Sequence, residues 1–394
     1  MLITERVTSL TKLTDFFRKT DIVLWLLTAA AVIYSMLLIS SMQRAGDYNY
    51  LRPQLAGVIV GGALAILISL ADYRFLIRRW GIALALGLGL IVLVFLFGIK
   101  VSGTDDMAWI ALPGGLTFQP SEFIKICFII TFTKHLCALR ERQLLHRPLA
   151  AATLAAHAFF PILMIHLQGD DGTALIFGMI FLIMCFIAGV QLRYFAILGG
   201  TMLIGVPILW NFFLNEEHRN RIRALFDLDG HSMTTYGWQQ YQSKVSIASG
   251  ALSGSGLYRG SRVAYAIVPE QENDFIMTVA GEELGFLGCL LLIVLLFGIM
   301  IKMMMNAANA TEDEGKLLCA GVFASFASQT IINIGMVLGF FPVIGITLPL
   351  FSAGGTSVLA TLICIGIVQS VRGHTLDDME TAKISRIRST RIRL

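Results

Sequence analysis

The stretch Pro269–Gly285, PEQENDFIMTVAGEELG, marks the point where a long polar segment meets a long apolar run. The polar segment covers about residues 215–273, and the apolar run begins at Phe275. Asp274 is therefore predicted to lie at the mouth of a membrane helix. Because an ionisable group at the edge of lipid is costly, it usually marks a functional pathway.

Small and polar residues recur after this aspartate with the spacing of one helical face. They are Asp274, Thr278, Gly281, Glu282 and Gly285. On a continuous helix these positions share a face. We expect that face to point into protein or a water-filled cavity, with the rest of the chain as the scaffold that presents it.

The composition indicates an all-α polytopic membrane protein. The 394 residues are 56% hydrophobic and 14% charged, with a mean hydropathy of +0.74, whereas a soluble domain is about a quarter charged. The net charge of +4 does not indicate nucleic acid, because the basic residues are spread over loop ends. The six cysteines fall in or beside apolar runs, so we expect neither disulfides nor a cysteine metal cluster.

Apolar runs predict about ten transmembrane helices, since twenty residues at ~1.5 Å each cross a ~30 Å hydrocarbon core. The first is read as an uncleaved helix rather than a signal peptide. The runs cover about 21–40, 53–71, 80–99, 119–138, 149–168, 172–190, 194–214, 274–303, 316–341 and 350–371.

An even number of spans places both termini on one side, and the basic residues of the short loops place that side in the cytoplasm. Residues 1–20 are then a cytoplasmic segment, 21–371 the ten-helix domain, and 372–394 a basic cytoplasmic tail. The tail is predicted to be solvated or to touch lipid, with a specific binding role as the alternative. Asp274 and a long loop, 215–273, between helices seven and eight face outside.

Three polar positions accompany the outer ends of the early spans. Trp109 lies in an outer loop, as either a membrane-belt tryptophan or a substrate contact. Glu122 and Lys125, spaced i, i+3, enter the fourth span together. They are predicted to line a polar substrate site, with a packing salt bridge as the alternative.

Two more predictions concern the later outer segments. Asp170, in QGDDGTAL, is read first as the N-cap of the sixth span and second as a substrate contact. The long loop carries Lys244, Arg259 and Arg262, which favour an anion site over a merely solvated loop. No Lys-Ser or Lys-Thr pair completes a phosphate-binding loop there.

The ninth span is followed by GFFPVIGITLPLFSAGGTSVL, residues 339–359. Its prolines and glycines predict a broken or re-entrant segment near 342–355. Such a segment is tolerated only where it lines a cavity or is buried in protein. Asn333 and Gln329 in the ninth span are predicted to satisfy its free backbone groups.

Five stretches in this order resemble the SEDS family (shape, elongation, division and sporulation) of RodA and FtsW type. The resemblance covers nearly the whole chain and implies a peptidoglycan glycosyltransferase. Such an enzyme joins the disaccharide-pentapeptide units of lipid II at the outer face of the cytoplasmic membrane, usually with a class B penicillin-binding protein. The stretches are AWIALPGGLTFQPSEFIK, QGDDGTAL, SKVSIASGALSGSGL, VPEQENDFIMTVAGEELGFLG and FFPVIGITLPLFSAGGTSVL.

The resemblance also implies residue roles. The family's essential aspartate falls on Asp274, and its tryptophan, span-four Glu and Lys, and second aspartate fall on Trp109, Glu122, Lys125 and Asp170. The chain departs from the family in lacking an arginine just before Trp109, in QGDDGTAL for QPDLGTAL, in Glu-Asn for His-Thr before Asp274, and in SAGGTS for SYGGSS. The missing arginine puts the donor pyrophosphate contact in doubt.

The implied chemistry needs a base and cations. Asp274 is the predicted general base of an inverting transfer, with an N-cap of span eight as its structural alternative. Lys244, Arg259 and Arg262, together with Arg219–Arg223, are candidates to stabilise the leaving pyrophosphate, and a divalent cation, Mg or Mn, is an open alternative. A lipid II flippase and a non-catalytic scaffold for a penicillin-binding protein are the competing functions.

Overall fold

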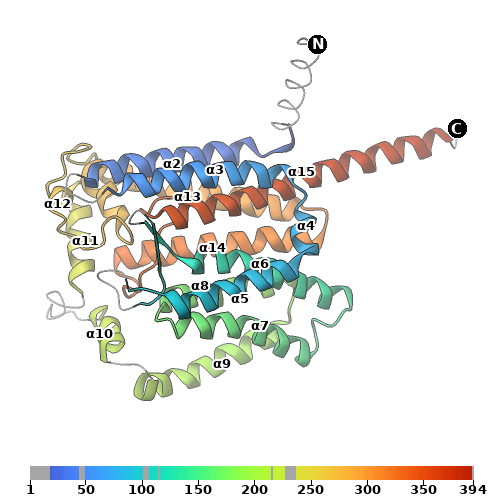
Figure 1. Cartoon of the computed structure of the whole chain (residues 1–394), viewed down its shortest axis with the longest axis horizontal. Coiled ribbons are helices and arrows are strands. Elements are labelled where there is room, and N and C mark those ends of the chain that lie inside the picture. Colours follow the sequence, from blue (N-terminus) through green and yellow to red (C-terminus); the bar gives the residue numbers. More distant parts are fainter. Residues whose placement is uncertain are drawn as a thin grey trace, which may run out of the picture.

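The structure, a computed structural model, describes residues 18–43, 49–100, 106–113, 116–213, 216–226 and 237–392. Most of the expected N-terminal segment 1–20 lies outside the described residues, as do most side chains of the tail beyond 381. The described chain is a bundle of long helices with one two-stranded hairpin of β1 (Ile110–Leu112) and β2 (Leu116–Phe118) (Figure 1).

Nine described helices are long and apolar enough to cross a membrane. The fourth expected span is a helix, α6 (Pro120–Glu141), but it is not among the nine, because it carries several charged residues. Ten spans therefore stays a prediction. The nine are α2 (Ile22–Met42), α3 (Leu51–Leu70), α5 (Trp80–Phe97), α7 (Pro148–His166), α8 (Asp171–Ala188), α9 (Leu192–Ile208), α13 (Ile276–Asn309), α14 (Asp313–Leu338) and α15 (Gly355–Ile392).

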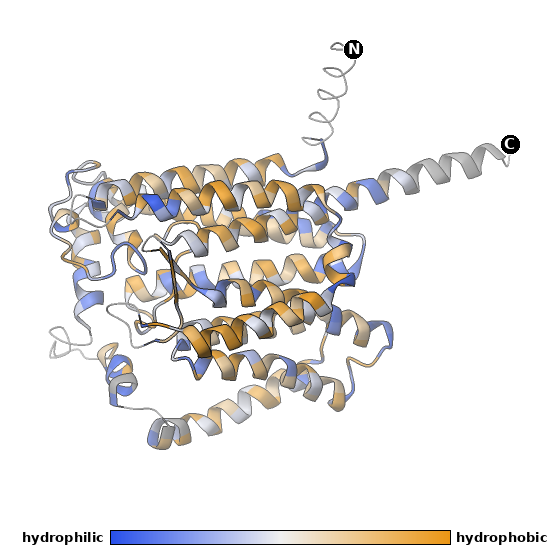
Figure 2. Ribbon diagram, viewed as in Figure 1, coloured by the Kyte–Doolittle hydropathy of each residue, from blue (hydrophilic) through white to orange (hydrophobic). Residues whose placement is uncertain are grey.

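Hydrophobic residues make up most of the length of the long helices, and hydrophilic residues collect towards the two ends of the bundle (Figure 2). On α9, for example, Leu203 is 77% exposed. A soluble bundle would bury such a face, so the exposed apolar flank is what a lipid-facing surface requires.

The centre of the bundle is α14, the most buried of the nine candidate spans, which packs against α6, α8, α13 and α15. α3 and α15 pack closely because small residues let their backbones approach. A Cβ placed on Gly57 would lie 2.3 Å from the carbonyl oxygen of Gly355. This packing fixes the start of α15 beside α3.

The described chain does not continue as one straight helix after Asp274, which corrects the predicted five-residue face. Gly285 has φ 66° and ψ −157°, and the chain reverses there. The Cys289 sulfur lies 3.8 Å from the Met277 carbonyl oxygen, whereas a straight helix would separate these residues by about 18 Å. Residues 276–284 thus fold back along the helix that follows.

Glycine is required at this reversal for two reasons. A positive φ is unfavourable for residues with a Cβ, and a Cβ on Gly285 would lie 2.4 Å from the Gly254 nitrogen. Phe286 and Leu287 donate backbone hydrogen bonds to Ala251 and Leu252. The loop before α13 therefore holds the reversal in place.

The long loop before α13 and the segment after α14 cover the end of the bundle at which Asp274 lies. The long loop contains three short helices, α10 (Glu216–Ala224), α11 (Trp238–Ser249) and α12 (Ser261–Ala264) (Figure 1). After α14, residues 340–354 form no helix, and Leu348 and Phe351 within them are fully buried. The predicted broken segment is therefore confirmed. At the opposite end lies α4 (Tyr73–Arg78).

Candidate functional site

Asp274 lies in the turn that precedes α13. Its backbone N–H donates to the Glu270 carbonyl oxygen at 3.1 Å, and its side chain is partly buried. The helix begins at Ile276 with Phe275 as its N-cap. The alternative that Asp274 is the N-cap of span eight is therefore wrong, and its carboxylate is not used to cap this helix.

Hydrogen bonds from α14 and the broken segment fix this turn. The Asn333 amide donates to the carbonyl oxygens of Asp274 (2.8 Å) and Ile346 (2.6 Å). The Ser352 hydroxyl donates to the Asn273 carbonyl oxygen, and the Ala353 N–H donates to that of Glu272 at 2.7 Å. The prediction that Asn333 satisfies the broken segment is confirmed.

Several carboxylates surround Asp274 and change its acidity. Burial, together with their negative charge, raises the pKa of Asp274 from 3.8 to about 7. A carboxyl group with such a pKa exchanges protons readily near neutral pH, which suits a general base. The contributing carboxylates are those of Glu270, Asp170, Glu272 and Asp106.

Glu270 and Glu272 are neighbours that the sequence analysis did not single out, although both stand in the stretch PEQEN. Burial also raises the pKa of Glu270, whose carboxylate accepts a hydrogen bond from Asn273 at 2.8 Å. The Tyr50 hydroxyl donates to Glu272 at 2.8 Å. The sequence does carry one sign of these neighbours, which is the concentration of acidic residues around Asp274.

Asp170 is the N-cap of α8, as predicted. One of its carboxylate oxygens accepts from the Thr173 N–H at 2.9 Å, and the other accepts from the Gln119 amide at 3.3 Å. Its charge contributes to the raised pKa of Asp274, so the structure brings these two predicted site residues close.

Trp109 lies on the chain that leads to the β-hairpin. Its carbonyl oxygen accepts from the Ile99 N–H at 2.7 Å, and the nearby Met107 N–H donates to the Gln168 carbonyl oxygen at 2.9 Å. The second contact places the Trp109 segment beside the start of α8. The indole itself is partly buried, which leaves both the belt and the substrate-contact interpretations open.

Glu122 and Lys125 form an ion pair inside the bundle. The Lys125 ammonium lies 2.8 Å from the Glu122 carboxylate, and the residues are 3% and 5% exposed. With Gln329 and Thr361 they line a cavity of about 20 Å³, which is room for about one water. Both charges are thus compensated, and this cavity is too small for a sugar.

Three of the predicted loop cations differ in how far their charged groups are available to a ligand. The Arg262 guanidinium donates to Ser246 at 2.8 Å and to Gln242, so it holds α12 against α11. Lys244 is exposed beside Gly339 at the end of α14, where a cation complements the helix dipole. Arg259 is exposed next to Gly256. Arg262 thus has fixed partners that the sequence did not reveal.

A family model described as cell cycle protein, covering FtsW, RodA and SpoVE, matches residues 18–376 of this chain. The chain belongs to this family, the SEDS family.

Individual relatives agree with the assignment. The SEDS chain is 34% identical over 368 residues to a probable peptidoglycan glycosyltransferase FtsW of Trichlorobacter lovleyi, covering 89% of this chain and 92% of the relative. It is 29% identical over 356 residues to peptidoglycan glycosyltransferase MrdB of Escherichia coli, covering 90% and 94%.

A solved structure extends the likeness to the fold. It belongs to work on the structural coordination of polymerization and crosslinking by a peptidoglycan synthase complex. The match has a TM-score of 0.74 and 26% identity, and it covers 90% of the SEDS chain and 98% of the solved chain.

The acids near Asp274 do not form a ready metal site. Among the residues that the structure describes, no three His, Cys, Asp or Glu side chains are arranged to hold a metal ion. The divalent cation therefore stays a prediction, and the general-base step proposed for this SEDS protein does not depend on it.

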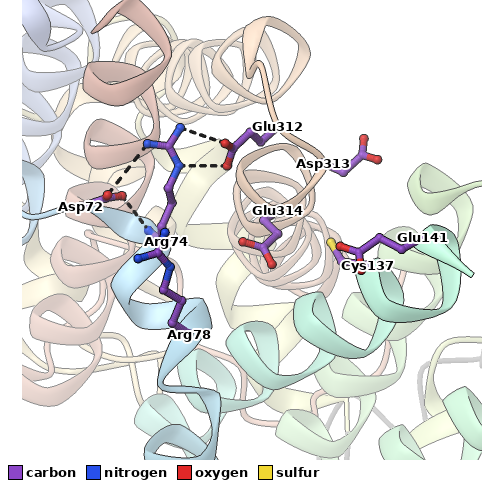
Figure 3. A pocket seen from close by; sticks show the side chains of 8 residues that line it. All are labelled: Asp72, Arg74, Arg78, Cys137, Glu141, Glu312, Asp313 and Glu314. Atoms are coloured by element: carbon purple, nitrogen blue, oxygen red, sulfur yellow. Dashed lines mark hydrogen bonds and ion pairs between the residues drawn. The ribbon is translucent and has the colours of Figure 1, made fainter. Parts of the chain in front are cut away.

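A second cavity, of about 640 Å³, is lined by charged residues that include Arg74 and Glu312 (Figure 3). It lies beside the connection between α13 and α14, at the end of the bundle opposite Asp274. In Figure 3 the Arg74 guanidinium lies between Asp72 and Glu312, and it donates to both oxygens of Glu312 at 3.0 Å. Arg74 also bonds Asp378 of α15 at 2.6 Å. These pairs join the ends of neighbouring helices, so this cavity of the SEDS protein is separate from the Asp274 site.

Proposed function

We propose that this SEDS protein is an inverting peptidoglycan glycosyltransferase that polymerises lipid II into glycan strands. The observation that carries the proposal is Asp274, a partly buried carboxylate with a pKa raised to about 7 and held in a hydrogen-bonded turn. The full-length similarity to FtsW and MrdB glycosyltransferases supports the same reaction class.

Asp274 acts as the general base in this proposal. It takes the proton from the 4-hydroxyl of the acceptor sugar while that oxygen attacks the anomeric carbon of the donor. The bond from this carbon to the pyrophosphate breaks, and undecaprenyl pyrophosphate leaves with the bonding electrons. One displacement inverts the carbon, so an α-linked donor gives a β-linked product. A base whose pKa lies near the working pH serves such a transfer best.

The other predicted residues have supporting roles. Lys244 and Arg259 are exposed on the segments that cover this end of the bundle, and we assign them to the leaving pyrophosphate. Arg262 is a weaker candidate, because Ser246 and Gln242 already bind its guanidinium. A divalent cation remains an alternative source of positive charge.

Substrate contacts are proposed nearer the bundle. Trp109 and Asp170 lie on neighbouring segments at the Asp274 end and are assigned to the sugars. Glu122 and Lys125 form a buried ion pair inside the bundle, so we assign them to supporting that site without facing solvent.

We also propose the location and partner. The chain is a multi-pass membrane protein, and its basic loop ends favour the bacterial cytoplasmic membrane with both termini in the cytoplasm. The Asp274 end then faces outward, where lipid II is polymerised. The similarity to a chain of a polymerising and crosslinking synthase complex supports a class B penicillin-binding protein as partner.

The experiment that tests the function separates polymerase from flippase and scaffold. The purified chain with a class B penicillin-binding protein is placed in vesicles with labelled lipid II, and glycan polymer and lipid movement across the bilayer are both measured. Polymer formation that requires this chain supports the proposal. Lipid movement without polymer would favour a flippase, and neither activity would favour a scaffold.

A further inference from the structure

We propose that Asn333 is a positioning residue for the reaction, because its amide fixes the turn that carries Asp274 to the broken segment after α14. The inference rests on the proposed function, since it assumes that Asp274 is the general base. Asn333 itself does not touch the reacting atoms; it acts through the backbone of Asp274.

Both amide donors of Asn333 are used in hydrogen bonds. An asparagine side chain has two N–H groups. In Asn333 one serves the Asp274 carbonyl oxygen at 2.8 Å and the other serves the Ile346 carbonyl oxygen at 2.6 Å. Asn333 is 0% exposed, so water cannot replace either bond when the side chain is removed. Two carbonyl groups would then be left without these donors inside the bundle.

A short covalent path connects the hydrogen bond at the Asp274 carbonyl oxygen to the Asp274 carboxylate. The carbonyl carbon of Asp274 is bonded to its Cα, so holding the carbonyl oxygen leaves mainly the side-chain torsions free. The same amide holds Ile346, and the adjacent Gly345 forms a wall near the carboxylate. A Cβ on Gly345 would lie 3.8 Å from one Asp274 carboxylate oxygen. Asn333 therefore sets both the base and the wall beside it.

The hydrogen bond from Asn333 to Asp274 is not required to start α13. The turn is also held by the Asp274 N–H to Glu270 and by Ser352 to Asn273. Loss of Asn333 is thus expected to shift the turn rather than unfold it. A displacement of about 1 Å at a reacting group can cost about 100-fold in rate.

The chain offers a matched control in Asn306 on α13. It is 3% exposed and donates its amide to the Asp21 carboxylate at 3.2 Å, towards the opposite end of the bundle. Asn306→Leu removes a buried amide of the same kind with no connection to Asp274. It reports what a buried asparagine contributes to stability alone.

The test compares Asn333→Leu, Asn306→Leu and wild type in the same partner complex. Initial rates at varied lipid II give kcat and KM, and thermal unfolding gives stability. We expect Asn333→Leu to lower kcat by about 10- to 100-fold, with KM changed by no more than about threefold, since a group acting only in the transition state leaves binding unaffected. Asn306→Leu is expected to lower Tm similarly while keeping its kcat.

The inference is overturned if Asn333→Leu keeps the wild-type kcat, or if both variants lose kcat in proportion to Tm. If Asn333→Leu does not fold, Asn333→Gln replaces it. The longer amide keeps both donors but displaces the turn, and a wild-type kcat in that variant would contradict the inference equally. If the Asp274→Asn variant keeps the wild-type rate, the assignment of the base is refuted instead. The two failures can therefore be told apart.

Discussion

The raised pKa of Asp274 predicts that replacing this residue makes the protein more stable at the pH where it works. In the folded protein the carboxyl holds its proton up to about pH 7, whereas its ordinary pKa of 3.8 applies in the unfolded chain. The folded state therefore binds more protons, and stability falls as pH rises from about 4 to about 7. Asp274→Asn removes this titration, so the variant should not lose this stability as pH rises.

The size of the effect follows from the shift. At about 1.4 kcal/mol per pKa unit, the two units between pH 5 and pH 7 amount to about 3 kcal/mol. The side chain is only partly buried, so solvent screening reduces this to about 1 kcal/mol. We therefore expect the Tm of Asp274→Asn, relative to wild type, to be about 2 °C higher at pH 8 than at pH 5.

Thermal unfolding of the detergent-purified protein, followed by intrinsic fluorescence at pH 5, 6, 7 and 8, measures this difference. Glu141→Gln is the control for an acid-to-amide change, because Glu141 is an exposed acid at the opposite end of the bundle. A Tm difference for Asp274→Asn that stays constant from pH 5 to pH 8 would refute the reasoning. So would one that shrinks as pH rises.

Three further outcomes are expected. Polymerisation by the wild type should rise with pH and reach half its maximum near pH 7, because Asp274 must lose its proton to act as a base; a pH–rate profile still flat down to pH 5 would count against this. Lys125→Met should cost about 3–5 kcal/mol of stability by leaving Glu122 charged and unpaired, and thermal unfolding should show that adding Glu122→Gln recovers part of it. Gly285→Ala should reduce the yield of folded protein, measured by size-exclusion profile, because its Cβ would meet the Gly254 nitrogen at 2.4 Å; a normal yield would argue against the reversal.

Much of the fold could be predicted because the signals are local. Runs of about twenty apolar residues indicate spans wherever the chain must satisfy its own backbone in lipid. Asp170 is a favoured N-cap type directly before a helix, and it caps α8. The prolines and glycines after α14 predict a break, and Asn333, one of the two amides predicted to serve it, donates to the Ile346 carbonyl oxygen within it.

The reversal at Gly285 could not be predicted, because it depends on contacts distant in sequence. The small and polar residues after Phe275 recur with the spacing of one helical face, so the sequence fits one continuous helix. The backbone of residues 251–254 turns the chain, because it accepts a hydrogen bond from the Phe286 N–H and packs against Gly285. A glycine alone does not predict such a turn, because membrane helices contain many glycines.

The same limit applies to the cations. Arg262 was predicted as a candidate for anion binding, yet Gln242 and Ser246 bind its guanidinium once α11 and α12 come together. The raised pKa of Asp274 likewise needs Asp170, which is about a hundred residues away and becomes a neighbour only in the folded bundle.

The measurement that tests the central claim most directly is glycan polymerisation from labelled lipid II by the purified chain with a class B penicillin-binding protein, comparing wild type with Asp274→Ala. Capture of the partner by both proteins confirms that each is folded. We predict polymer from the wild type and none from Asp274→Ala. Polymer from both would contradict the assignment of Asp274 as the general base.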